Sequence, residues 1–432
     1  ETTRAATLEA VADWAEQRLA HTHGRTREAL RELVERALVE RGRVDFYARQ
    51  PGEGMDWFTR AHEVAGPTAR TWTWIGMVSR RRGELADAKH AGEAALELDG
   101  HWRPALVHLG NLHHQLGDRD TSVDYMRRLI AEGTATRYEL TRAWVGLERV
   151  RALDDALIAA EQLMRRYERP TSHAVHAVTL WELRRRDEAD AAMARFATRR
   201  DAASVRGMAW YLGRTRRSRE AHELLFSLKA AKTYGGDFVE LFHMLRRDGH
   251  LRLAHQAAIG ALAYHPGYAE LEALRHEAAA EVRVFTGEWT PRQRQVDPVD
   301  AVVGRILHVV GKSVPYAHTG YCVRTDRTVV AQKADGLDVH VVTEPGFPFE
   351  LGIHAADDED VHGVPHHRLR IPDDARRPLR LDERLDVHVD ALSDVALRVR
   401  PAGLHAASDF RNGLGARAVG ERYRLPVVYE VR

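Results

Sequence analysis

The feature that most constrains the fold of this chain is an internal repeat of 34 residues. The hexapeptide Gly-Glu-Leu-Ala-Asp-Ala that begins at Gly83 recurs in form at Gly117 and at Arg151, each 34 residues after the last. A second landmark keeps the same period, since the Trp-x-x-Ile-Gly of residues 72–76 is followed by the Leu-x-x-Leu-Gly of residues 106–110. A fixed period of this length indicates a repeat architecture, in which each unit buries its apolar face against its neighbours.

These landmarks resemble the tetratricopeptide repeat. Trp72 and Gly76 match its W-x2-L-G opening, and Ala88 matches the small residue twelve positions after the glycine. Small residues at these places let the two helices of a hairpin approach closely. The resemblance is firm for two units and looser afterwards. The later second helices are marked by Ala191, Ala221 and Ala254.

The residues between these landmarks carry a helical pattern. Apolar side chains recur every three or four residues, as in 140–147 and 153–160. We therefore predict about a dozen antiparallel helices from residue 4 to about 285, which form an all-α tetratricopeptide-like superhelix over 1–285. The expected role of such an array is protein interaction, through a partner or through self-association, rather than chemistry.

Composition excludes several classes of protein. The 432 residues contain 64 Lys and Arg against 63 Asp and Glu, a formal net charge of +1 that gives no strong field for nucleic acid. The single Cys322 allows no internal disulfide, which fits a reducing compartment. No apolar run approaches the roughly 18 residues that a membrane span needs. We expect a cytoplasmic protein, with peripheral binding at the inner face of the membrane left open.

Two groups of histidines could suggest a metal. His108, His113 and His114 cluster in one predicted helix, but neighbouring residues face different sides of a helix, so a solvated face is the favoured interpretation. The polar stretch 354–367 combines four histidines with three aspartates, but its spacing matches no ligand pattern. A mobile loop is the prediction for that stretch, and no metal site is expected.

The pattern changes near residue 286. The helical period stops at Thr286, and we place a linker at 286–303. Beyond it, short β-branched runs at 306–310, 339–343 and 427–431 alternate with helical stretches, which predicts βαβ units and a parallel sheet. Gly311-Lys312-Ser313 suggests a phosphate-binding loop, but the motif needs glycine at position 306, where the chain has Ile306.

Several segments of this second part, taken together, resemble a known family. They are 306–316, 318–325, 336–343, 345–348, 405–414 and 426–432. In combination they look like the opening of a family-four retaining glycosyltransferase of the GT-B class, whose N-terminal Rossmann-like domain would cover 304–432. One departure is Ala407, which stands where the family's H-A-H-S segment has its second histidine.

The resemblance implies transfer of a sugar from a nucleotide-sugar donor to an acceptor hydroxyl with retention, in cell-surface glycan or polysaccharide synthesis. It implies no cofactor beyond the nucleotide-sugar substrate, and a glycan or lipid-linked acceptor as the second substrate. The family continues into a second domain that holds most donor contacts. The expectation is therefore that the chain is truncated within its first Rossmann-like domain and is inactive on its own.

The resemblance also assigns site residues. Two would be catalytic and the others would bind donor or acceptor, with no metal ligand among them. The catalytic pair would be His405 and Glu430. The binding residues would be Gly311, Thr319, Gly320, Arg324, Asp409, Asn412 and Arg432.

Each of these residues has a structural alternative. Arg324 could be a solvated helix residue, and His405 could be a packed residue at a strand end. Asp409 and Asn412 could cap the following helix, while Glu430 and Arg432 could form a structural ion pair. At the level of the whole chain, the alternative function is a non-catalytic repeat scaffold with a degenerate Rossmann domain.

Overall fold

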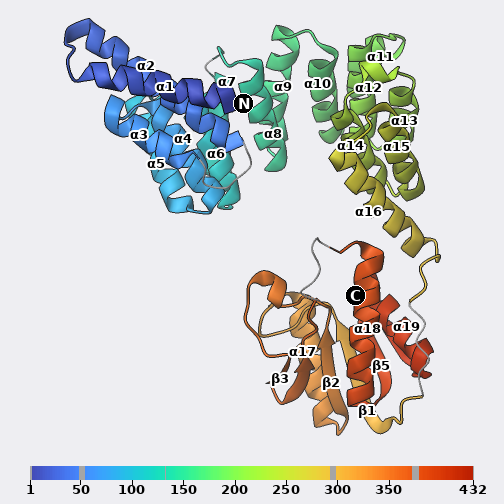
Figure 1. The fold of residues 1–432 in the computed structure, drawn as a ribbon. Helices are drawn as coiled ribbons and strands as arrows, with labels where there is room; N and C mark the ends of the chain where they lie inside the picture. Colours follow the sequence, from blue (N-terminus) through green and yellow to red (C-terminus); the bar gives the residue numbers. More distant parts are fainter. Residues whose placement is uncertain (1, 48–53, 132, 292–297, 372–378, 432) are drawn as a thin grey trace. The chain divides into compact units, whose positions relative to one another are not determined.

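The computed structural model describes residues 2–47, 54–131, 133–291, 298–371 and 379–431 (Figure 1). Contacts divide the chain into two compact units, Glu1–Thr233 and Tyr234–Arg432. Each unit is described by itself. No described helix is both long and apolar enough to cross a membrane.

The first unit consists of α-helices that pair in sequence order (Figure 1). Each even-numbered helix from α2 to α8 packs against the helix that follows it, and α4 with α6 and α6 with α8 also contact each other. Their bounds are α1 Thr2–Leu19, α2 Gly24–Tyr47, α3 Met55–Ala65, α4 Ala69–Arg82, α5 Leu85–Leu98, α6 Arg103–Gln115, α7 Arg119–Ala131, α8 Arg137–Arg149, α9 Leu153–Arg166, α10 Pro170–Glu182, α11 Arg186–Ala197, α12 Ala202–Arg214 and α13 Ser218–Phe226.

Local sequence explains where these helices begin and how closely they pack. Thr136 caps α8 by accepting a hydrogen bond from the Glu139 amide, and the Glu139 carboxylate accepts one from the Thr136 amide. Gly110 of α6 lies against Met126 of α7, where an added Cβ would come within 2.5 Å of the methionine Cε. Close helix packing therefore depends on the small residues that define the repeat.

Two predictions about the helical part need correction. Sixteen α-helices precede the sheet in the described residues, where the sequence pattern predicted about a dozen. The predicted solvated face is wrong for two of its three histidines, because His108 and His113 are buried while His114 is exposed. His108 Nε2 lies 3.0 Å from the Ala88 carbonyl, and His113 Nδ1 lies 3.0 Å from Asp118 Oδ2. Both rings fill the space between paired helices.

The second unit begins with three helices and continues into a six-stranded sheet. The strand order is β3-β4-β2-β1-β5-β6, and every pair is parallel except β3 with β4. The helices are α14 Gly235–Arg247, α15 Leu251–Tyr264, α16 Ala269–Phe285, α17 Gly320–Ala334, α18 Leu381–Val399 and α19 Phe410–Tyr423. The strands are β1 Val302–Val310, β2 Asp338–Thr343, β3 Asp358–Val361, β4 Val364–His367, β5 Pro401–Ala407 and β6 Val427–Glu430.

Helices cover both faces of this sheet (Figure 1). Leu307 and Val309 of β1 join a core with α18 and α19, and Val310 faces the opposite core, which includes Val329 of α17. This alternation follows from the two-residue period of a strand. The end of α16 joins the first core through Val284, and so does Trp289.

The sheet corrects two further predictions. The predicted all-parallel sheet is mixed, since the hairpin of β3 and β4 adds an antiparallel edge strand. This hairpin occupies most of the stretch that was predicted to be a mobile loop. His366 and His367 of β4 are buried, which an apolar pattern could not have indicated. The helical pattern ends at Phe285 and β1 begins at Val302, while the compact units divide earlier, after Thr233.

Candidate functional site

The residues predicted from the sequence gather at the carboxyl edge of the sheet. Strand β2 pairs with one side of β1, and β5 pairs with the other side. The order in which strands are added to the sheet therefore reverses between β1 and β5. Ligands of open α/β sheets bind at such a switch point. Here the loop that leaves β1 at Gly311 and the turn that leaves β5 at Ser408 lie at this place.

The predicted catalytic pair does come together. His405 Nε2 lies 3.4 Å from Glu430 Oε2, and Arg324 Nη2 lies 3.4 Å from Glu430 Oε1. His405 lies within β5 rather than after it, with its ring centroid 4.6 Å from that of His308 in β1. The Glu430 carboxylate thus lies between the Arg324 guanidinium and the His405 imidazole, so its negative charge has partners within the fold.

The two predicted residues after β5 have structural contacts. Asp409 caps α19 by accepting a hydrogen bond of 2.9 Å from the Arg411 amide. Asn412 is fully buried, and its Nδ2 donates to the carbonyls of Ala407 and Ser408. These bonds match the helix-capping alternative, and they hold the turn at Ser408 in place.

The loop after β1 is also engaged in the fold. The Gly311 amide donates to the Tyr321 hydroxyl at 3.1 Å, and Thr319 Oγ1 caps α17 by accepting from the Cys322 amide. Gly320 opens α17, and a Cβ there would meet no atom within 4 Å. Arg432 lies outside the described residues.

Sequence reasoning missed two residues at this edge, Glu344 and Arg411. Arg411 Nη2 lies 3.2 Å from Glu344 Oε2 and 2.5 Å from Asp409 Oδ2, so one guanidinium joins two carboxylates. Burial raises the pKa of Glu344, and the charge of Arg411 opposes that change. The only available signal was position, because Glu344 directly follows β2.

A cleft of about 980 Å³ adjoins this edge in the second unit. It is lined by α14, α16, α18 and the start of α19, and it carries several arginines. Those arginines already have carboxylate partners: Arg246 pairs with Glu277 and Glu281, Arg380 with Glu383, Arg384 with Glu350, and Arg411 with Asp409. Among the described residues no group of three or more His, Cys, Asp or Glu side chains is placed to hold a metal.

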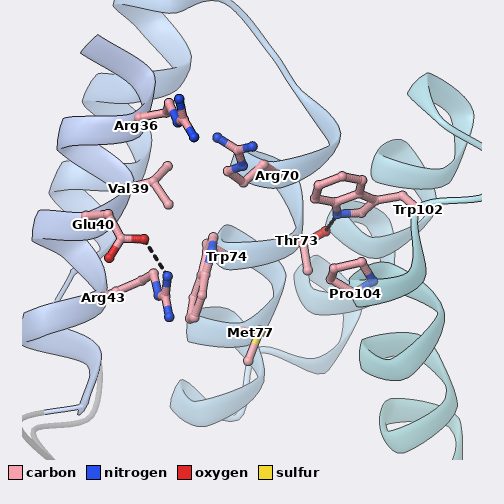
Figure 2. Close-up of a pocket in the computed structure, with 10 residues that line it drawn as sticks. All are labelled: Arg36, Val39, Glu40, Arg43, Arg70, Thr73, Trp74, Met77, Trp102 and Pro104. Carbon is pink, nitrogen blue, oxygen red and sulfur yellow. Dashed lines mark hydrogen bonds and ion pairs between the residues drawn. The ribbon is translucent and has the colours of Figure 1, made fainter. Parts of the chain in front are cut away.

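The first unit presents a different kind of surface. A pocket of about 420 Å³ opens across α2, α4 and α6 (Figure 2). Its lining is Val39, Trp74, Met77, Trp102 and Pro104, with Thr73 and with Arg36, Glu40, Arg43 and Arg70 at the sides. Apolar and aromatic side chains therefore make up half of the lining, while three of the four charged residues are arginines.

Contacts behind the pocket hold its two tryptophans in place. Trp74 stacks on Phe58 with centroids 5.5 Å apart and meets Phe46 edge to face at 5.3 Å. Trp102 Nε1 donates to Thr73 Oγ1 at 3.0 Å, as the dashed line in Figure 2 marks. Both rings remain partly accessible. The apolar surface is therefore formed before any partner arrives.

Comparisons with known proteins found distant matches among solved structures. No protein-family model matches the chain, and no curated protein matches it. Among solved structures, yeast Tom70 matches 66% of this chain and 60% of its own at 17% identity and a TM-score of 0.43. A tetratricopeptide repeat protein from Parabacteroides merdae matches 57% of this chain and 98% of its own, at 13% identity and a TM-score of 0.36. The tetratricopeptide repeat domain of P58(IPK) matches 66% and 76%, at 15% identity and a TM-score of 0.23.

The predicted glycosyltransferase function is wrong. The comparisons find tetratricopeptide repeat proteins, and nothing in them supports a GT-B glycosyltransferase domain, a nucleotide-sugar donor or a glycan acceptor. The segments behind that resemblance, such as 306–316, form the end of a strand and the loop that leads to a helix. Many α/β folds contain this succession, so it specifies local structure rather than chemistry.

Proposed function

We propose that this chain is a non-catalytic repeat scaffold that binds a protein partner in the pocket across α2, α4 and α6. The observation that carries the proposal is the open, preformed apolar surface of Trp74, Met77 and Trp102. In this proposal the C-terminal sheet with its flanking helices is a Rossmann-like domain that serves a structural purpose. Its parallel strands β4, β2, β1, β5 and β6 support that classification.

The chemistry of the pocket favours a protein ligand. Tryptophan and methionine are enriched at the centres of protein interfaces, where a partner's apolar side chain loses its water in a close-fitting pocket. A volume of about 420 Å³ suits one or two side chains of an extended segment. The surrounding arginines offer hydrogen bonds at the margin, where Arg43 also lies 5.3 Å from the Trp74 ring centroid.

The order already present in the pocket favours binding. Because Trp74 is packed on Phe58 and Trp102 is hydrogen-bonded to Thr73, neither ring has to be ordered when a partner binds. Ordering a side chain at an interface costs roughly 0.5–1.5 kcal/mol, so fixed rings preserve affinity.

Selection from a random peptide library on the full chain tests the proposal. We expect the enriched peptides to share a large apolar residue and to lose about tenfold or more in affinity when Met77 is replaced by Gln. The matched control is Ile158→Gln, which changes an exposed apolar residue of α9 outside the pocket and should leave affinity unchanged. Enriched peptides that bind both variants equally, or oligomers of the chain that fill the pocket and exclude peptides, would overturn it.

A further inference from the structure

Three arginines on α4 and α8 form a charged group that the protein itself does not neutralise. Arg80 is in the last turn of α4, and Arg142 and Arg149 are on α8. In the described part of the chain none of the three forms an ion pair with a carboxylate. We call Arg80, Arg142 and Arg149 the α4–α8 arginine cluster.

The charges of the other two arginines act on Arg80. The pKa of Arg80 is lowered by burial and then by repulsion from Arg142, Arg81 and Arg149. Arg80 Nε is buried and has no hydrogen-bond partner. Arg81 donates a hydrogen bond to the Phe46 carbonyl and lies over the Phe46 ring, so these contacts bring no carboxylate near the three arginines.

Nearby carboxylates are engaged elsewhere. Glu148, which precedes Arg149 in α8, pairs with Arg214 of α12. Glu139, at the start of α8, pairs with Arg103. A guanidinium held among like charges, with one N–H buried and unpaired, gains more from an incoming anion than a guanidinium that must first leave a salt bridge.

The cluster continues the proposed partner site. Met77 lines the pocket, and Arg80 follows it one helical turn later on α4. Helix α6 contacts both α4 and α8, so the pocket and the cluster belong to one run of neighbouring helices. An extended segment with its apolar residue in the pocket could place the residues beside it at the arginines.

We propose that the α4–α8 arginine cluster binds the side-chain carboxylates of an acidic stretch in the partner, next to the apolar residue that enters the pocket. This inference rests on the proposed scaffold function and specifies the partner's chemistry. A protein partner fits better than nucleic acid, because the net charge of +1 gives no extended basic surface to follow a phosphate backbone. Carboxylates also match the planar, two-point hydrogen bonding of arginine.

Fluorescence anisotropy with labelled oligoglutamate and the full chain tests the inference. We expect saturable binding at low salt that weakens as salt rises, and no binding of oligolysine. Arg142→Gln should weaken oligoglutamate binding about fivefold to tenfold, and Arg142→Lys should lose less because it keeps the charge. The control Arg165→Gln removes an exposed arginine of α9 that is paired with Glu161, and it should have no effect.

The outcomes separate this inference from the proposed function. If oligoglutamate does not bind, binds equally to Arg142→Gln and the original chain, or binds more weakly than single-stranded DNA, the acidic-partner inference is wrong. The pocket proposal stands in each of those cases as long as library peptides remain sensitive to Met77→Gln. If oligoglutamate binding depends on Arg142 while no library peptide depends on Met77, the cluster is an anion site and the pocket proposal fails. A thermal melt of each variant checks that it is folded.

Discussion

Arginine serves two different purposes in the two regions of this protein. At the carboxyl edge of the sheet, Arg411 joins Glu344 and Asp409, and Arg324 joins Glu430. In the helical repeats, Arg80 is repelled by Arg142, and neither forms an ion pair with a carboxylate in the described residues. The first set resembles an active site in sequence but is neutralised within the fold, whereas the second set carries no motif and keeps its charge available.

The difference shows what marks a binding surface in an arginine-rich chain. A paired arginine contributes to folding, and a ligand can use it only after the existing ion pair is broken. An unpaired arginine among like charges raises the free energy of the folded state, which an anionic partner can lower again. The number of arginines in a sequence is therefore a poor indicator of a binding surface, and the presence or absence of an ion-pair partner for each arginine is a better one.

The largest expected effect is a loss of stability on removal of a buried leucine, and it should be similar in the two regions. Leu140 in α8 and Leu392 in α18 are both fully buried, so replacing either with alanine should lower the free energy of unfolding by about 2–5 kcal/mol. Urea denaturation would measure this, with Leu98→Ala as an exposed control that should change it by less than about 0.5 kcal/mol. A negligible loss at Leu392 would mean that the core around α18 is not packed as described.

Removing a paired arginine should cost stability. Arg411→Ala leaves the buried Glu344 carboxylate without its cation, and we expect a loss of about 1–3 kcal/mol. Arg411→Ala combined with Glu344→Gln should recover part of that loss, since the unpaired charge is then absent. An Arg411→Ala variant as stable as the original chain would contradict the claim that this edge is a structural network.

Acid should destabilise both regions through buried histidines. Burial lowers the pKa of His108 and of His388 to about 4, below the ordinary 6.5. The unfolded chain therefore binds protons first, so the stabilisation is complete above pH 6.5 and is lost as pH falls toward 4. At pH 5 each histidine should cost about 2 kcal/mol relative to pH 7. His388→Leu should reduce the loss between pH 7 and pH 5, and an unchanged pH dependence would exclude His388 as a source.

The smallest effect is the most informative for the comparison. Arg142→Ala removes a charge that is repelled by its neighbours, so we expect no loss of stability or a gain of up to about 0.5 kcal/mol. The same measurement on Arg127→Ala, which breaks an ion pair with Asp155, provides a paired control in the same unit. A clear loss on removal of Arg142 would reveal a partner within the fold and weaken the comparison.

Parts of the fold were predictable where a residue pattern repeats the geometry of an element. The predicted strand at 306–310 is confirmed by β1, which spans Val302–Val310. Ala221 and Ala254 lie in α13 and α15 as predicted. The hairpin of β3 and β4 was missed because its strands are short and polar, and His367 is buried through its contacts with Asp358 and His340.

The candidate site was less predictable, for a different reason. His405 and Glu430 lie close together because the carboxyl ends of adjacent parallel strands lie at the same edge of the sheet. Their proposed chemistry came from a family resemblance that the comparisons do not support. The sequence contained no signal for the pocket, since Val39, Trp74 and Trp102 lie on three separate helices and acquire a common purpose only when those helices pack.

The sequence by itself determined the repeat, the helical period and the change to strands near residue 300, because each depends on neighbours along the chain. Tertiary structure decided which charges are neutralised. Arg411 forms an ion pair with Glu344, which is 67 residues away in the sequence, and Arg80 is repelled by Arg142, which is 62 residues away. No local sequence pattern records whether such distant side chains attract or repel each other. Coulomb interactions depend on distance in space, so the surface that remains free to bind a partner exists only in the folded chain.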